Sequence, residues 1–333
     1  MPRKKISQAS VLDVSRPEAL ELVPIRDGYG QGVVEAGQRD ERVVVLCADL
    51  TESTRSHWFA EKFPHRFFQV GIAEQNLAVI GSGMAAGGKI PFISSYATFS
   101  PGRNNEQIRT NICLNNMPVK VVGAHAGISV GPDGATHQAL EDIALMRVLP
   151  RMVVVVPCDA VEAQKATLAI ASNNQPSYLR LGREKTPVIT TPETPFEIGQ
   201  ALLVREGTDV LIVACGVMVY EALRAADALA QLGIHAAVLN NHTIKPLDEK
   251  TILQIAKKCG AVVTAEEHQV AGGMGSAVAE LLARHTPLPM EFVGVHNRFG
   301  ESGAPAELMK AFGLDATAIT EAAQRVIARK STN

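Results

Sequence analysis

The chain alternates short runs of β-branched and other apolar residues with longer segments of helical spacing, and this alternation restricts the fold more than any other feature. The run at residues 43–47 is continuously apolar, which is typical of a strand buried on both faces. Strands and helices that alternate in this way form parallel sheets with helices on both faces, so the sequence predicts a doubly wound α/β fold. Further strands are expected in the first part of the chain at 66–70, 90–93, 119–123, 152–156 and 177–179.

A proline- and threonine-rich stretch at residues 185–199 interrupts this pattern once and is typical of a linker. The alternation then resumes, and a chain of 333 residues is too long for one ordinary core, so we expect two domains with mostly parallel sheets. Strands of the second domain are expected at 210–214, 235–239, 261–265 and 290–295. The predicted organisation is a tail at 1–20, a first domain at 21–186, a linker at 187–197 and a second, smaller domain at 198–333.

The composition argues against several classes of protein. A net charge of -2 gives no electrostatic footprint for nucleic acid. No apolar stretch approaches the ~20 residues that cross a bilayer, and the basic cluster Arg3-Lys4-Lys5 is not followed by the apolar segment of a signal peptide. The five cysteines are odd in number, widely spaced and never Cys-x-x-Cys, which favours free, buried thiols in a cytoplasmic protein. No spacing of metal ligands stands out.

One carboxylate lies where such a fold places ligands. Glu74 belongs to the segment Val70-Gly71-Ile72-Ala73-Glu74-Gln75-Asn76, which follows an apolar run and leads into a helix-like stretch. Strand, turn and helix in this order put Glu74 in the first helical turn. An acid there also suits the helix macrodipole and needs no further function. Its assignment to a site therefore depends on other residues.

The glycine-rich loop at residues 123–138 is a second candidate, because it follows a predicted strand and precedes a helix expected near Gln138. Ligands of open α/β sheets bind at the carboxyl ends of the strands. The loop contains four glycines, which allow close backbone approach, together with His125, Asp133 and His137, which offer proton transfer and hydroxyl recognition. Either histidine alone could equally serve a structural hydrogen bond, but the cluster favours a site.

Aromatic and basic residues add two weaker signals. Tyr96 and Phe99 follow a predicted strand, and they either pack in the core or stack on a flat heterocycle. Arg26, Ser53 and Arg180 are scattered, and each alone is consistent with a surface charge or a helix cap. Together they resemble an anion site, because guanidinium groups present a planar fork of donors that suits phosphate.

Taken in order, these pieces resemble the carboxyl-terminal half of a transketolase over roughly residues 20–325. That half consists of a pyrimidine-binding domain and a smaller C-terminal domain, which agrees with the two domains expected here. The matching motifs are Arg26, Ala48-Asp49-Leu50-Thr51, Gly71-Ile72-Ala73-Glu74-Gln75-Asn76, Tyr96-x-x-Phe99, Gly131-Pro132-Asp133-Gly134-Ala135-Thr136-His137-Gln138, Arg180 and Phe299-Gly300-Glu301-Ser302-Gly303-Ala304-Pro305.

The resemblance implies a site for thiamine diphosphate and for a sugar phosphate. In the family, the glutamate matching Glu74 hydrogen-bonds the aminopyrimidine ring and so promotes removal of a proton from the thiazolium carbon. Phe99 matches the ring that stacks on the pyrimidine, Tyr96 a neighbouring aromatic and Asp49 an acidic residue near the cofactor. In the family, three residues handle the sugar hydroxyls and the protons at the donor carbonyl. Their matches in this chain are His125, Asp133 and His137. Those matching the binders of the terminal phosphate are Arg26, Ser53 and Arg180.

The chain departs from the family in two places. A third aromatic expected near the stacking pair is replaced by the polar turn Ser100-Pro101-Gly102-Arg103. In addition, the Gly-Asp-Gly motif with which the amino-terminal domain of a transketolase binds Mg²⁺ and diphosphate occurs nowhere in the 333 residues. The chain begins almost directly at the pyrimidine-binding domain. We therefore expect it to hold half of the cofactor, while Mg²⁺ is bound by a partner subunit.

These expectations combine into one hypothesis: the C-terminal subunit of a split transketolase. It would transfer a two-carbon ketol unit between sugar phosphates in an α2β2 assembly with an N-terminal, diphosphate-binding subunit. The alternatives are a β subunit of a 2-oxo acid dehydrogenase, a 1-deoxyxylulose-5-phosphate synthase-like subunit and a non-catalytic subunit of the same fold. The first is disfavoured by the candidate phosphate ligands, because 2-oxo acids carry no phosphate, and the last by the retention of Glu74 and both loop histidines. A sulfonated or branched sugar phosphate would need nearly the same groups.

Overall fold

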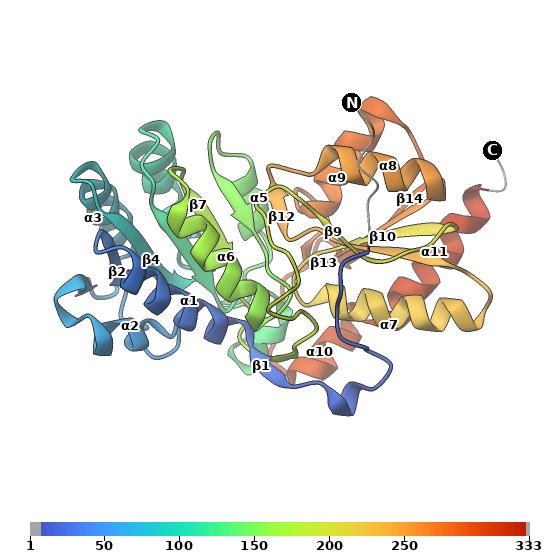
Figure 1. The fold of residues 1–333 in the computed structure, drawn as a ribbon, viewed down its shortest axis with the longest axis horizontal. Helices are drawn as coiled ribbons and strands as arrows, with labels where there is room; N and C mark the ends of the chain where they lie inside the picture. The colour runs from blue at the N-terminus through green and yellow to red at the C-terminus, as the bar shows by residue number, and fades with distance from the viewer. Residues whose placement is uncertain (1–7, 331–333) are drawn as a thin grey trace.

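The computed structural model describes residues 8–330 and places two α/β domains next to each other (Figure 1). Residues 1–7 of the expected tail, with the basic cluster Arg3-Lys4-Lys5, lie outside the described residues. Residues 8–20 run along the second domain, where the amide of Ala9 donates a hydrogen bond of 2.7 Å to the carbonyl of Leu203. Part of the expected tail is therefore packed against the folded chain.

The first domain is built on a seven-stranded sheet in the order β12-β6-β7-β5-β4-β2-β3. All neighbouring pairs are parallel except β12 with β6. The strands are β2 (Val43–Cys47), β3 (Phe67–Gln69), β4 (Ile90–Tyr96), β5 (Lys120–Ala124), β6 (Val153–Val155), β7 (Ser177–Arg180) and β12 (Thr243–Lys245).

Helices cover both faces of this sheet because successive side chains of each strand point to opposite sides. Val45 and Phe92 pack against α1 and α6 on one face, while Leu46 and Ile93 pack against α3 and the π-helix η3 on the other. The helices of this domain are α1 (Ile25–Arg39), α2 (Ser56–Lys62), α3 (Glu74–Ala86), α4 (Asn105–Gln107), η3 (Ile108–Leu114), α5 (Asp142–Arg147) and α6 (Ala160–Ser172). Short 3-10 turns are η1 (Pro17–Ala19), η2 (Pro64–Arg66) and η4 (Ile128–Asp133).

The second domain has a five-stranded sheet in the order β14-β13-β10-β11-β9, parallel except for the edge strand β9. Helices α7 and α11 cover one face, and α8 and α9 cover the other (Figure 1). The strands are β9 (Leu202–Arg205), β10 (Val210–Ala214), β11 (Ala236–Asn240), β13 (Val262–Gln269) and β14 (Met290–Val295). The helices are α7 (Met218–Gln231), α8 (Glu249–Cys259), α9 (Met274–His285), α10 (Pro305–Ala311) and α11 (Ala316–Lys330).

The prediction of two doubly wound α/β domains with mostly parallel sheets is confirmed. The domains are joined by more than a linker. Strand β12 follows β11 of the second domain but adds to the edge of the first sheet, and one apolar cluster runs through both domains. In the expected linker, β8 (Lys185–Pro187) pairs antiparallel with β1 (Leu22–Pro24).

Some local expectations differ from the structure. The helix expected near Gln138 begins at Asp142, because the preceding loop forms η4 and turns at Gly131 and Gly134, whose φ angles are +79° and +73°. All five cysteines are free and buried, as expected. Within residues 8–330, no helix combines the length and the apolar character required to cross a bilayer.

Candidate active site

The parallel strands of the first sheet end at a common edge, and the candidate residues follow those ends. Asp49 follows β2, Glu74 follows β3, Tyr96 ends β4 and His125 follows β5. Strands β5, β4, β2 and β3 are neighbours in the sheet, so residues far apart in the sequence meet at one edge. This is where ligands bind in open α/β sheets.

Glu74 is the first residue of α3 and lies on the wall of an open hollow of about 470 Å³. Its side chain is only 4 % exposed. Its carboxylate oxygens each lie 3.4 Å from a guanidinium nitrogen of Arg103 across the hollow. The side-chain amide of Asn104 donates a 2.9 Å hydrogen bond to the main-chain carbonyl of Glu74. The carboxylate is therefore held at a helix N-terminus, which favours its negative charge, and faces a space that a ligand can enter.

Three rings form a stack beside this hollow. Tyr96 lies between Phe99, at 5.9 Å between ring centroids, and His125, at 3.9 Å, and both pairs are nearly parallel. His137 contacts Phe99 edge-on with centroids 5.4 Å apart. The two aromatic residues are half-buried at the edge of the sheet and do not fill its core, so of the two sequence interpretations the geometry favours a stacking surface.

His125 and Arg26 form the polar part of the edge. Arg26 donates from one guanidinium nitrogen to Nε2 of His125 at 3.0 Å and to the main-chain carbonyl of Ser53 at 2.9 Å. Because arginine has no acceptor, Nε2 of His125 must be unprotonated and the ring carries its hydrogen on Nδ1. Burial, together with the charges of Arg26 and Arg183, lowers the pKa of His125 to about 2. The histidine is thus neutral at physiological pH, and its buried Nδ1 has no partner among the described residues.

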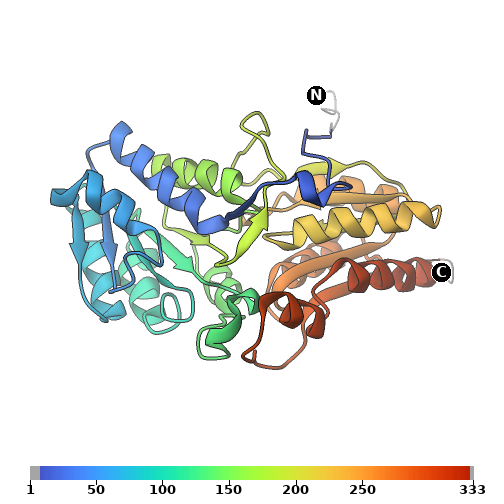
Figure 2. The ribbon, with the colours of Figure 1, turned by 90° about the horizontal axis from the view of Figure 1, so that it is seen from below.

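The loop between β5 and α5 is held in place by the second domain. Gly127 adopts a φ of +92°, and a Cβ there would lie 2.3 Å from the carboxyl carbon of Glu267, so only glycine fits. That carboxylate accepts a 2.6 Å hydrogen bond from the amide of Ser129. The side-chain amide of Gln138 donates to the carbonyl of Glu301 at 3.0 Å. Figure 2 shows α10 of the second domain against this loop.

Arg183 is a site residue that the sequence interpretation missed. It lies three residues beyond the end of β7, donates a 2.6 Å hydrogen bond to the carbonyl of Val130 and has a nitrogen 3.8 Å from Asp133. Its side chain is half-buried, and its charge contributes to the lowered pKa of both Arg26 and His125. The detectable signal was its position, because residues just beyond a parallel strand reach the ligand edge.

The structure gives Arg180 protein partners. It was expected beside Arg26 and Ser53 as a phosphate ligand, but its guanidinium is buried, with Nε 2.8 Å from Asp142 and another nitrogen donating to the carbonyl of Glu267 at 2.8 Å. Burial alone would lower the pKa of Arg180, but the carboxylates of Asp142 and Glu267 outweigh this effect and raise it. The structure thus places Arg180 in the contact between the domains, where its charge is already neutralised.

Two further candidates lie at the edge in less specific positions. Asp49 is exposed and has a φ of +61°, and its amide donates a 2.7 Å hydrogen bond to the side chain of Gln69. Ser53 contacts Arg26 through its main-chain carbonyl, so its hydroxyl is not used in that contact. Both residues lie near the candidate ligand space without a fixed side-chain role.

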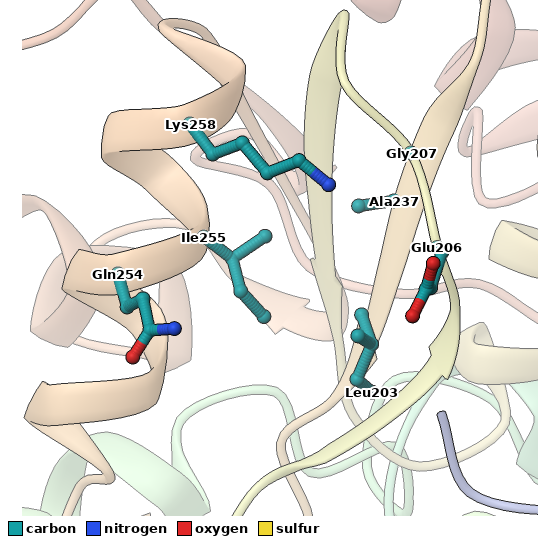
Figure 3. Close-up of a pocket in the computed structure, with 7 residues that line it drawn as sticks. All are labelled: Leu203, Glu206, Gly207, Ala237, Gln254, Ile255 and Lys258. Carbon is teal, nitrogen blue, oxygen red and sulfur yellow. The ribbon is translucent and has the colours of Figure 1, made fainter. Parts of the chain in front are cut away.

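A different hollow, of about 180 Å³, lies in the second domain (Figure 3). Leu203, Ala237 and Ile255 form its apolar base, and Glu206 and Lys258 come from opposite walls. It contains none of the candidate residues, so the carboxyl edge of the first sheet is the better site. Over residues 8–330, no group of three or more His, Cys, Asp or Glu side chains is arranged to hold a metal ion.

The carboxyl edge fits the half of thiamine diphosphate that contains the aminopyrimidine ring. Such a ring needs an aromatic face for stacking and a carboxylate at its edge. Phe99 and Glu74 offer both, because one planar guanidinium, that of Arg103, contacts the Phe99 ring face and the Glu74 carboxylate at once.

A two-domain α/β protein with a carboxylate, an aromatic stack and half-buried arginines at one strand edge has the features of a protein that binds a ligand at that edge. Comparison with known families is specific. The model of the transketolase pyrimidine binding domain matches residues 22–188, and that of the transketolase C-terminal domain matches residues 199–319. The chain belongs to the transketolase family, whose domains imply dependence on thiamine diphosphate.

Individual relatives agree. A 6-deoxy-6-sulfo-D-fructose transketolase subunit of Clostridium sp. (strain MSTE9) is 42% identical over 307 residues, which cover 92% of this chain and 95% of the relative. A solved split gene transketolase, described as an inactive β4 tetramer, is 45% identical with a TM-score of 0.87, over 92% of this chain and 99% of that one. A 1-deoxy-D-xylulose-5-phosphate synthase of Thermomicrobium roseum is 40% identical over 313 residues, which cover 92% of this chain but only 49% of the synthase.

Proposed function

We propose that this chain is the C-terminal subunit of a split, thiamine diphosphate-dependent transketolase. With a partner subunit that binds the diphosphate and Mg²⁺, it transfers a two-carbon ketol unit between sugar phosphates, in an assembly expected to be α2β2. The observation that carries this proposal is the placement of Glu74 and Phe99, whose carboxylate and ring face converge on one planar group beside an open hollow.

The need for a partner rests on two observations. No Gly-Asp-Gly motif for diphosphate and Mg²⁺ occurs in the 333 residues. Moreover, this chain matches nearly the full length of two relatives. One is a transketolase subunit and the other a split gene transketolase. The solved relative is described as an inactive β4 tetramer, which agrees with a requirement for a second kind of subunit.

When bound, thiamine diphosphate supplies the nucleophilic carbon and the electron sink for carbon–carbon cleavage. Glu74 would orient the aminopyrimidine through a hydrogen bond between its carboxyl group and a ring nitrogen, and Phe99 would fix the plane of the ring. His125 is neutral and buried, and its Nδ1 is the proposed hydrogen-bond donor to a substrate oxygen. Because its ring is neutral, it adds no positive charge beside the guanidinium of Arg26. His137, at the edge of the stack, is the group expected to move protons at the donor carbonyl.

Arg26 and Arg183 are the proposed ligands of the terminal phosphate. Both are half-buried at the carboxyl edge. Burial is the main cause of the lowered pKa of Arg26, and the charges of Arg55 and Arg183 lower it further. Two guanidinium groups that repel each other are stabilised by an anion between them. Asp133, 3.8 Å from Arg183, is placed to accept a hydrogen bond from a sugar hydroxyl. A sulfonate carries a similar anionic oxygen set, so a sulfonated sugar is a candidate substrate as it is for the clostridial relative.

A synthase-like reaction is the second candidate, because the Thermomicrobium enzyme is 40% identical over this chain. It differs in the donor, since a 2-oxo acid donor releases CO2 and a ketose donor does not. Glu74 and the phosphate ligands serve either reaction, so the donor must be tested directly.

The test is reconstitution. The chain is purified alone and together with the chain that supplies the diphosphate-binding domain. Each preparation is assayed with Mg²⁺, thiamine diphosphate, an aldose phosphate acceptor and, in separate assays, a ketose phosphate or a 2-oxo acid as donor. We expect ketol transfer from the complex and none from the single chain. Activity of the single chain would contradict the split-subunit proposal, and CO2 release from a 2-oxo acid without ketol transfer would favour the synthase-like reaction.

A further inference from the structure

Arg103 occupies the position where the aminopyrimidine ring is proposed to bind. It lies in the polar turn Ser100-Pro101-Gly102-Arg103. Its guanidinium carbon is 4.4 Å from the centroid of the Phe99 ring, and one nitrogen is 3.4 Å from both carboxylate oxygens of Glu74. The side chain thus makes, at the same time, the stacking contact and the carboxylate contact that a flat, N–H-bearing heterocycle would make.

The two occupants exclude each other. A guanidinium group is planar and stacks on an aromatic face at the same separation as a second ring. The other neighbours of Phe99 in the stack are Tyr96, at 5.9 Å, and His137, which lies edge-on at 5.4 Å. The face next to Glu74 is therefore the one that Arg103 covers, and a heterocycle can take it only after the guanidinium has moved away.

The turn itself does not depend on Arg103. The side-chain amide of Asn104 donates to the carbonyl of Glu74 at 2.9 Å and to the hydroxyl of Ser100 at 3.1 Å. The amide of Arg103 donates to the carbonyl of Phe99 at 2.8 Å, which is a main-chain contact. The Arg103 side chain is 54% exposed, so it can turn into solvent while Asn104 keeps the turn in place.

We propose that Arg103 is a latch that closes the pyrimidine site of the free chain and is displaced when the ring of the cofactor binds. This inference rests on the proposed function, because it requires the hollow beside Glu74 to be the site of that ring. A latch that is closed in most molecules lowers the apparent affinity by the fraction of molecules that are open. An ion pair with an exposed partner and a cation–π contact are each weak, so we expect a reduction of about five- to tenfold.

The experiment uses the full-length chain alone with thiamine, which carries the pyrimidine ring but no diphosphate and therefore needs no partner subunit. Affinities are measured by calorimetric titration for the wild type, Arg103→Ala, Arg103→Lys and Arg109→Ala. Arg109 is the matched control, since it is an exposed arginine on the neighbouring η3 and forms no ion pair within residues 8–330. Thermal unfolding of every variant checks that the fold is retained.

We expect Arg103→Ala to bind thiamine about five- to tenfold more tightly than the wild type. Arg103→Lys should fall in between, because it keeps the charge near Glu74 but loses the planar stacking group. Arg109→Ala should match the wild type. Equal or weaker binding by Arg103→Ala, or no detectable binding by any variant, overturns the latch, because its removal must expose the site.

A combined variant separates failure of the latch from failure of the proposed function. In Arg103→Ala/Glu74→Gln, the gain in thiamine affinity should be lost if the ring binds at Glu74. If the gain persists, the ring binds elsewhere and both the latch and the site assignment are wrong. If Arg103→Ala shows no gain while the reconstituted complex transfers ketol groups, only the latch is wrong.

Discussion

Two groups of charged residues lie at the carboxyl end of the first sheet, and they differ in how closely their charges are paired and how deeply they are buried. At the open edge, Arg26 and Arg183 are half-buried; Arg26 contacts a histidine and a carbonyl, and Arg183 lies 3.8 Å from Asp133 and 3.7 Å from Glu184. At the junction of the domains, the side chain of Arg180 is only 6% exposed and lies 2.8 Å from the carboxylate of Asp142. The first group is the one proposed to bind an anion, whereas the second lies in the contact between the domains.

The comparison shows that an arginine near a strand end is not by itself a ligand of phosphate. Arg180 is the last residue of β7 and Arg183 follows three residues later, yet of the two only Arg183 adds, after burial, to the lowered pKa of both Arg26 and His125. A guanidinium that already donates to a carboxylate and a buried carbonyl has few donors left. The hydrogen bonds that an arginine already makes within the protein therefore decide whether its guanidinium can bind a ligand or serves the structure.

The largest expected effect is at the junction. Asp142→Ala removes the acceptor of both the Tyr178 hydroxyl, at 2.7 Å, and Arg180, at 2.8 Å, and leaves the buried charge of Arg180 without its hydrogen-bonded carboxylate. We expect the free energy of unfolding to fall by about 3–5 kcal/mol, measured by urea denaturation of the chain. The double variant Asp142→Leu/Arg180→Met should lose much less. An equal loss in both proteins would show that the ion pair itself is not what stabilises the junction.

The next effect is at the open edge. Glu74→Gln keeps the size of the side chain but removes the carboxylate, so turnover of the reconstituted complex should fall by about a hundred- to thousandfold. The urea midpoint of the chain should change little, because Glu74 faces a hollow and is not part of the core. Measurement of kcat for ketol transfer tests this expectation. Near-normal turnover would remove Glu74 from the mechanism.

The smallest effect distinguishes the two arginines by substrate. Arg183→Ala should raise KM about ten- to a hundredfold for phosphorylated sugars, because it removes a charged hydrogen bond to phosphate, and should leave KM for unphosphorylated sugars nearly unchanged. Arg180→Ala should change KM to the same extent for both kinds of sugar, since the guanidinium of Arg180 contacts only protein groups. Initial-rate kinetics with both kinds of acceptor provide the measurement. A rise in KM for phosphorylated sugars alone, seen in Arg183→Ala but not in Arg180→Ala, would support the comparison. The same selective rise in Arg180→Ala instead would reverse it.

Much of the fold could be predicted because apolar runs identify buried parallel strands regardless of their partners. The strands at 43–47, 210–214 and 290–295 coincide with β2, β10 and β14. The edge strands β9 and β12 were not expected. These strands have only four and three residues, so each offers little sequence from which a strand can be predicted. Pairing of β12 with a strand of the other domain is a long-range event that no local pattern encodes.

The candidate site was predictable to the extent that each residue follows a strand. Glu74, Tyr96, Phe99 and His125 could be placed at one edge because parallel strands end together. The choice between Arg180 and Arg183 could not be made in this way. It depends on which face of β7 is covered, and Arg180 shares its face with Tyr178, which also contacts the buried Asp142. Only the packed structure provides that information.

The strand that crosses between the domains also limits how the site can be shielded from water. Thr243 and Lys245 of β12 pair with Val155 and Val154 of β6, and Arg180 donates to the carbonyl of Glu267 across the same junction. Rotation of one domain against the other would break these contacts, so they oppose a hinge movement that would shield the site from water. In the proposed assembly, this protection would come from the surface of the second subunit laid over the open edge, so that assembly itself would close each active site.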